Sequence, residues 1–94
     1  MTKADLVNDI SEKTGIEKVE VQTTIEALME SIKGSLSKGE NVYLRGFGSF
    51  VVKQRAEKTA RNISKNTTII IPAHFIPSFK PSKSFVTKVK NNVK

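Results

Sequence analysis

The feature that most constrains the fold is a stripe of apolar residues between residues 17 and 38. Apolar residues here recur about once per helical turn of 3.6 residues, so they share one side of a helix. The stripe consists of Val21, Ile25, Leu28, Met29, Ile32 and Leu36. The sequence therefore predicts a long helix over 17–38, with an apolar face that other parts of the fold must cover.

Elements on both sides of this helix follow from local signals. Thr2 and Asp5 have the spacing of a capping box, which predicts a first helix over 3–13. Residues that favour β structure predict strands over 41–45 and 50–55, joined by a turn at 46–49.

A further β-favouring segment, 68–71, follows a polar stretch at 62–67, which indicates that the chain returns along itself as a long hairpin. The three prolines that come next, Pro72, Pro77 and Pro81, are expected to interrupt regular structure up to a last helix over 82–93, capped by Ser82. Helices, strands, ribbon and helix in this order predict an α+β fold.

The length of the chain limits the core that one copy can build. If about 20 of the 94 residues project as a ribbon, about 70 remain to form the core. A core of this size seldom stabilises a fold without disulfides, a metal site or a second subunit. Cysteine is absent, which excludes disulfides and thiolate metal sites. We therefore expect a dimer.

Charge is distributed unevenly along the chain. The net charge is +7, and residues 46–94 hold ten of the 16 basic side chains but only one acidic residue, Glu57. Nucleic acid is the partner that such a surface favours, because each phosphate that is neutralised releases counterions. An acidic protein or a membrane surface stays open on charge alone.

Several classes of function find no support in the residues. His74 is the only histidine, and no nucleophile and base stand at a recognisable spacing, so we expect no enzyme, no cofactor, no small-molecule substrate and no metal site. The longest apolar run, 69–73, is far shorter than a membrane span, and the first residues do not resemble a secretory signal. Both observations, with the lack of cysteine, favour a cytoplasmic location.

One motif is more specific than these patterns. The segment Gly46-Phe47-Gly48-Ser49-Phe50, followed by Arg55, Arg61-Asn62, Phe79 and Lys83, resembles the signature of the HU/IHF family of bacterial histone-like, DNA-bending proteins. The resemblance spans the chain as a single domain, 1–94. It implies an intertwined dimer. Each chain would contribute a helical base (1–40), saddle strands (41–52), a β-arm (53–75) and a C-terminal helix (82–93). The saddle and the arm together would form a three-stranded antiparallel sheet with a long β-ribbon.

The resemblance also implies roles for individual residues. The dimer core would contain Phe47, Phe50, Phe79, Ile25, Leu28 and Ile32. The arm would enter the minor groove of duplex DNA, and the flanks would contact phosphates of the bent duplex. The DNA-binding residues would be Lys3, Lys53, Arg55, Lys58, Arg61, Asn62, Ile63, Lys65, Lys80, Lys83 and Lys90.

Ile63 departs from the family pattern, which has proline after Arg61-Asn62. In the family this side chain wedges between base pairs and kinks the duplex. Isoleucine is also an apolar wedge, but its φ is not fixed, so the sharpness of the kink stays open. Asn66 likewise replaces the usual glycine of the tip. Intercalation by Ile63 is the expectation, against the alternative that it packs along the ribbon.

Three hypotheses of function remain. The first is architectural DNA bending with little sequence preference, as in nucleoid-associated HU proteins. The second is bending at preferred sites, as in the IHF branch. The third is a dimeric basic module that binds RNA or an acidic protein. Pairing of two identical chains is the expected assembly, and pairing with a paralogue is the alternative.

Overall fold

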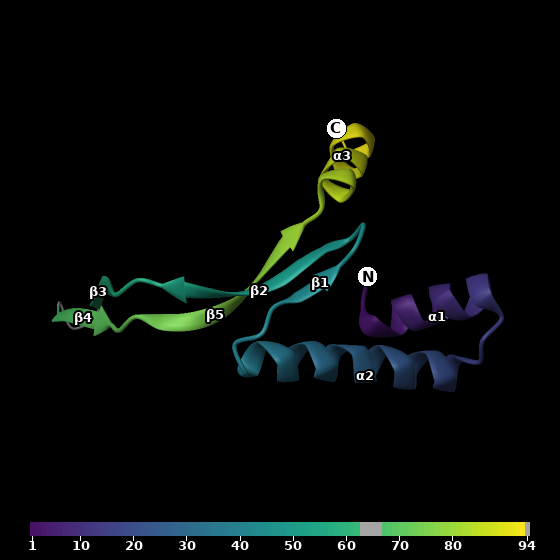
Figure 1. Ribbon diagram of the computed structural model, residues 1–94, viewed down its shortest axis with the longest axis horizontal. Helices are drawn as coiled ribbons and strands as arrows, with labels where there is room; N and C mark the ends of the chain where they lie inside the picture. Colours follow the sequence, from purple (N-terminus) through teal and green to yellow (C-terminus); the bar gives the residue numbers. More distant parts are fainter. Residues whose placement is uncertain (63–66, 94) are drawn as a thin grey trace. The chain divides into compact units, whose positions relative to one another are not determined.

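The computed structural model describes residues 1–62 and 67–93, and for residues 60–62 and 67–69 only the course of the backbone is considered. The described chain divides into two units, residues 1–35 and 36–94. Figure 1 labels their helices and strands.

The first unit is helical. Helix α1 (Lys3–Thr14) begins at a complete capping box, in which the Asp5 amide donates to Thr2 Oγ1 (3.3 Å) and the Thr2 amide donates to Asp5 Oδ2 (2.9 Å). Helix α2 (Lys18–Ser37) follows after a short turn. Both helices lie within one residue of their predicted bounds, because caps and periodicity are local properties of the sequence.

The second unit contains a three-stranded antiparallel sheet in the order β1 (Val42–Leu44), β2 (Gly48–Arg55) and β5 (His74–Pro81). The turn between β1 and β2 lies at residues 45–47, one to two positions before the predicted turn. Gly46 supplies its positive φ of 81°, and the Phe47 amide donates to the Leu44 carbonyl at 3.0 Å. Gly48, expected in the turn, instead pairs with both Leu44 and Pro81.

The expectation that prolines interrupt this region is wrong for two of the three. Pro77 and Pro81 lie within β5, opposite Val52 and Gly48. Among the described strands β5 pairs on one side only, with β2, and an edge strand tolerates proline where no ladder donor is needed. The two prolines are four residues apart, so both fall on non-hydrogen-bonded pairs of the ladder.

Beyond the sheet, β3 (Lys58–Asn62) and β4 (Thr67–Ile71) pair with each other as a two-stranded ribbon. The last sheet pair is Arg55 with His74, and the first ribbon pair is Lys58 with Ile71. Two residues separate these pairs on each strand, so the ribbon continues the register of the sheet. Pro72, which has no amide donor, lies in this gap, and the predicted long hairpin is confirmed with one interruption.

The last helix, α3 (Lys83–Asn92), is capped as predicted, with the Phe85 amide donating to Ser82 Oγ at 3.2 Å. The Ser82 amide donates to the Phe47 carbonyl at 2.9 Å, which ties the start of α3 to the β1–β2 turn. The α+β class with a helical hairpin, a three-stranded sheet, a ribbon and a C-terminal helix is therefore confirmed.

Candidate nucleic-acid interface

One face of the sheet carries an aromatic cluster. Phe50 on β2 lies directly opposite Phe79 on β5, with ring centroids 4.9 Å apart, and Phe79 lies 5.2 Å from Phe47. Phe85 of α3 stacks on Phe47 at 5.3 Å. Because successive side chains of a strand point to opposite faces, this cluster commits one face of the sheet to packing.

The opposite face follows from the same register and presents cations. Its residues on β2 and β5 include Ser49 opposite Lys80, Lys53 opposite Ile76, and Arg55 opposite His74. The sequences of β2 and β5 contain no acidic residue. We call Ser49, Lys53, Arg55, His74 and Lys80 the cationic face.

The cationic face is open to solvent. Lys53, Arg55, His74 and Lys80 are all exposed. His74 Nδ1 lies 3.0 Å from the Pro72 carbonyl, and since a carbonyl only accepts, Nδ1 carries the proton of this bond. Among the predicted DNA-binding residues, the pairing of β2 with β5 thus places Lys80 on the same face as Lys53 and Arg55, which are distant from it in the sequence.

Lys58 is predicted with the same group but has the other strand parity. It pairs with Ile71, so strand alternation places it on the face opposite Lys53 and Arg55. Arg61 and Asn62 lie on β3 opposite Thr68 and Thr67, and Ile63 and Lys65 lie outside the described residues.

Helix α3 carries two further predicted cations. Lys83 lies in its first turn and Lys90 in its last, seven residues apart and therefore on the same side of the helix. Lys83 follows Lys80 closely in the chain, separated by Pro81 and the capping Ser82. The connection from β5 to α3 thus extends the basic surface of the second unit.

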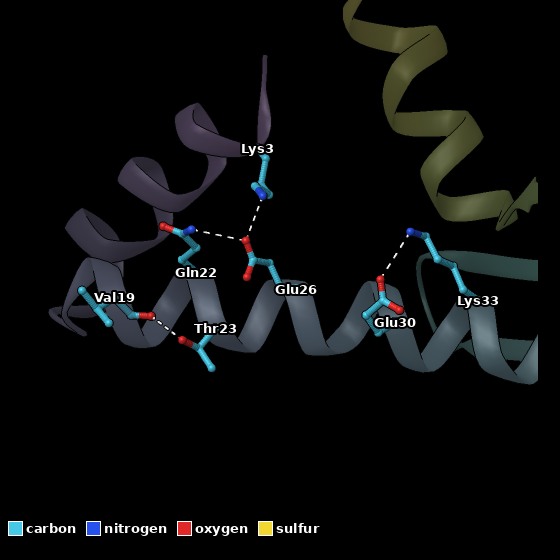
Figure 2. Close-up of polar contacts among 7 residues, drawn as sticks. All are labelled: Lys3, Val19, Gln22, Thr23, Glu26, Glu30 and Lys33. Carbon is cyan, nitrogen blue, oxygen red and sulfur yellow. Dashed lines mark hydrogen bonds and ion pairs between the residues drawn. The ribbon is translucent and has the colours of Figure 1, made fainter.

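Lys3, in the first unit, is already engaged. Its ammonium donates to Glu26 Oε1 at 2.8 Å, and Gln22 Nε2 donates to the same oxygen at 3.2 Å (Figure 2). The hydrogen bond from Lys3, then that from Gln22, lowers the pKa of Glu26. The ammonium has three N–H donors, so Lys3 keeps donors for a phosphate while the carboxylate offsets part of its charge.

The predicted dimer core is largely uncovered in a single chain. Leu28 is 49%, Phe47 45% and Phe79 38% exposed, while Ile25, Ile32 and Phe50 are half-buried. A hollow of about 460 Å³ lies between β5 and α3. It is lined by Phe79, Pro81, Phe85, Val86, Val89 and Lys90.

Sequence reasoning did not single out Ser49 and His74 as neighbours of the arm cations. Alternation along β2 could have revealed Ser49, which is four residues before Lys53 and hence on its side. Nothing local to the sequence could reveal His74, because its position depends on the pairing of β2 with β5.

Alternative kinds of site find no geometric basis in the described part of the chain. There, no three His, Asp or Glu side chains come close enough to hold a metal ion. None of the described helices combines the length and the hydropathy that crossing a membrane requires.

Comparisons with known proteins agree with this geometry. The sequence profile of a family described as "Bacterial DNA-binding protein" matches residues 1–90. DNA-binding protein HU of Staphylococcus aureus is 42% identical over 90 residues, covering 96% of this chain and all of the relative. The HU protein of Thermus thermophilus is 39% identical, covering 96% of this chain and 93% of the relative.

Solved structures show the same likeness. The HU chain of an Anabaena HU–DNA cocrystal structure superposes with a TM-score of 0.89 at 33% identity, covering both chains completely. HU from Thermotoga maritima superposes with a TM-score of 0.67 at 29% identity, covering 95% of this chain and 98% of that one. Sequence profile, relatives and fold agree over nearly the whole length, and the chain therefore belongs to the bacterial DNA-binding protein family that includes HU.

Proposed function

We propose that the chain acts as a dimer that binds duplex DNA with little sequence preference and bends it, as an architectural, non-enzymatic protein of the bacterial nucleoid in the cytoplasm. The observation that carries the proposal is the separation of two faces on one sheet. One face bears the aromatic cluster, and the other bears the exposed Lys53, Arg55 and Lys80 and continues in register into the ribbon.

The dimer is supported by what a single chain leaves uncovered. Val7 and Val21 are the only buried hydrophobic residues among those described, whereas Val86 and Val89 of α3 are both 47% exposed beside the hollow. Apolar surface of this extent in a soluble chain marks an interface. A second copy of the chain fits this role, and a paralogue with the same surface is the alternative that mixing experiments would reveal.

Duplex DNA suits the cationic face for electrostatic reasons. Each cation that meets a phosphate releases counterions, which gives affinity without reading sequence. We propose that Lys53, Arg55 and Lys80 bind in this way. Five further lysines would extend the contact: Lys83, Lys90, Lys58, Lys65 and Lys3. The Anabaena HU protein, which shares this fold, crystallised together with DNA, and this supports duplex DNA as the partner.

Bending would come from the tip of the ribbon. We propose that Arg61 and Asn62 contact the minor groove, whose A·T edges offer only acceptors, and that Ile63 inserts between base pairs. Unstacking a step costs a few kcal/mol, so DNA that is nicked or gapped should bind more tightly than intact duplex.

Ligase-dependent closure of short DNA fragments tests binding and bending together. Fragments of about 150 bp, one persistence length, close slowly alone and should close faster with the protein. Ile63→Ala should keep most of the affinity and lose much of the acceleration. A protein that binds these fragments but does not promote circles would contradict the bending proposal.

Competition experiments separate the remaining functions. A strong preference for one sequence over random DNA would favour a site-specific bending protein. Tighter binding to duplex RNA or to an acidic protein than to nicked DNA would refute the assignment to DNA.

A further inference from the structure

We propose that Ile70 makes the ribbon selective for deoxyribose, so that it rejects RNA through an apolar contact. The inference rests on the proposed function of duplex DNA binding and adds to it the residue that distinguishes the two sugars. Ile70 is 63% exposed, so its apolar side chain is open to a bound nucleic acid.

The register places Ile70 on the continuation of the cationic face. It lies opposite Thr59, four residues from His74 on the same side of the strand and about 13 Å from it along the chain direction. Because the gap between sheet and ribbon adds two residues to each strand, the alternation of faces is kept. The face that carries cations near the sheet thus carries Thr59 and Ile70 farther out, and the same alternation places Glu57 before this pair and Arg61 after it.

The composition of β4 strengthens this contrast. Its sequence, TTIII, contains no charged residue, and β3 carries the only cations of the described ribbon. At the Thr59–Ile70 pair itself the only polar group is the threonine hydroxyl, and the nearest cation on that face along β3 is Arg61, two residues from Thr59. An exposed apolar side chain here is suited to the C–H groups of the sugars that line a groove.

The two nucleic acids differ at that surface. A ribose displays a 2′-hydroxyl, which is both donor and acceptor, whereas deoxyribose has only hydrogens at this position. A side chain of isoleucine that covers a 2′-hydroxyl removes water from it and offers no hydrogen bond in return, which is unfavourable. The same side chain against deoxyribose buries apolar surface on both partners, which is favourable.

The neighbouring residue provides a matched control. Ile71 is the same amino acid on the same strand, 38% exposed, but pairs with Lys58 on the opposite face. Threonine at either position keeps the branched Cβ that favours strands and replaces a short alkyl group by a hydroxyl. Ile70→Thr and Ile71→Thr therefore perturb the ribbon similarly and differ in the face that they change.

The experiment measures the affinities of the full-length protein for three duplexes of one sequence: all DNA, DNA with ribonucleotides scattered in one strand, and all RNA. We expect Ile70→Thr to reduce the preference for DNA over the ribonucleotide-containing duplex about fivefold, mainly through tighter binding of the latter. Ile71→Thr should change it less than twofold, and Ile70→Val should retain it. The slope of log affinity against log salt should be the same for all, because no cation is removed.

Two failures are distinguishable. If the DNA preference of Ile70→Thr equals that of the parent, or Ile71→Thr shifts it equally, while DNA binding stays salt-dependent, the role of Ile70 is wrong and the proposed function stands. If the parent itself shows no salt-dependent binding of duplex DNA, both fail. Circular dichroism melts of the three variants show whether each keeps the fold of the parent.

Discussion

Replacing Gly48 by alanine tests the packing of the aromatic cluster against the sheet. A Cβ at this position would lie 2.6 Å from the Lys80 carbonyl oxygen and 2.7 Å from two atoms of the Phe79 ring, where ordinary contacts are 3.4–4 Å. The carbonyl belongs to the backbone of β5, which is paired with β2, so it cannot move without disturbing the ladder. The Phe79 ring is held between Phe47 and Phe50.

Neither neighbour can move without breaking other contacts. The loss of folding free energy in Gly48→Ala should therefore lie at the upper end of the range for overpacked cores, about 3 kcal/mol per chain. For a domain of this size, 1 kcal/mol corresponds to about 4–8 °C in Tm. We therefore expect Gly48→Ala to lower Tm by on the order of 15 °C. The assay is thermal unfolding followed by circular dichroism, at one fixed protein concentration because the stability of a dimer depends on concentration.

The same substitution at Gly34 is the control. An added Cβ there meets nothing within 4 Å, and the residue lies in α2, about 200° around the helix from Ile32 and its apolar stripe. Alanine should stabilise the helix by about 1 kcal/mol. If Gly48→Ala melts at the temperature of the parent, or the two variants shift Tm in the same direction, the close approach of β2 to Phe79 is wrong.

Three further predictions concern charge and capping. Lys53→Gln should make the slope of log affinity for DNA against log salt shallower by about 0.9 for each phosphate contact removed. Lys13→Gln, which changes an ion-paired lysine of α1, should leave this slope unchanged. If Lys53→Gln has the same slope as the parent, the role of Lys53 is refuted. Ser82→Ala should cost about 1 kcal/mol in urea unfolding through loss of the α3 cap, and a variant as stable as Ser84→Ala would contradict this. Since the pKa of Glu26 is lowered in the folded state, the stability that this group contributes is present at neutral pH and is lost as the pH falls below the ordinary pKa of a glutamate. The Tm values of parent and Glu26→Gln should therefore converge on acidification, and a constant difference would exclude this ion pair as the cause.

The sequence predicted those elements whose signals are local. The capping box at Thr2 and the cap at Ser82 each lie within one turn, and the stripe of α2 repeats at every turn of one helix. The structure confirms both caps and the helix predicted from the stripe. The assignment of the family is confirmed as well, because its motif is continuous around Phe47 and Phe50.

Features that depend on pairing between distant strands were less accessible. The prolines of β5 were expected to break structure, since the sequence does not show that this strand has a neighbour on one side only. The ion pair of Lys3 with Glu26, which joins α1 to α2, likewise needs coordinates. Roles of the individual DNA-binding residues stay predictions, as do the division of the chain into base, saddle and arm and the intercalation by Ile63.

The matched gap of two residues between sheet and ribbon has a consequence for how this protein can change during evolution. One pairing register runs from Gly48 to Asn62 through both strands of the arm. A single inserted or deleted residue in either strand would therefore move each later side chain of that strand to the opposite face. An insertion before Ile70 would exchange the faces of Ile70 and Ile71, and one before Lys58 would exchange the faces of Lys58 and Thr59. Arms of different length should therefore arise by compensated changes on both segments, whereas substitutions are free to accumulate one at a time.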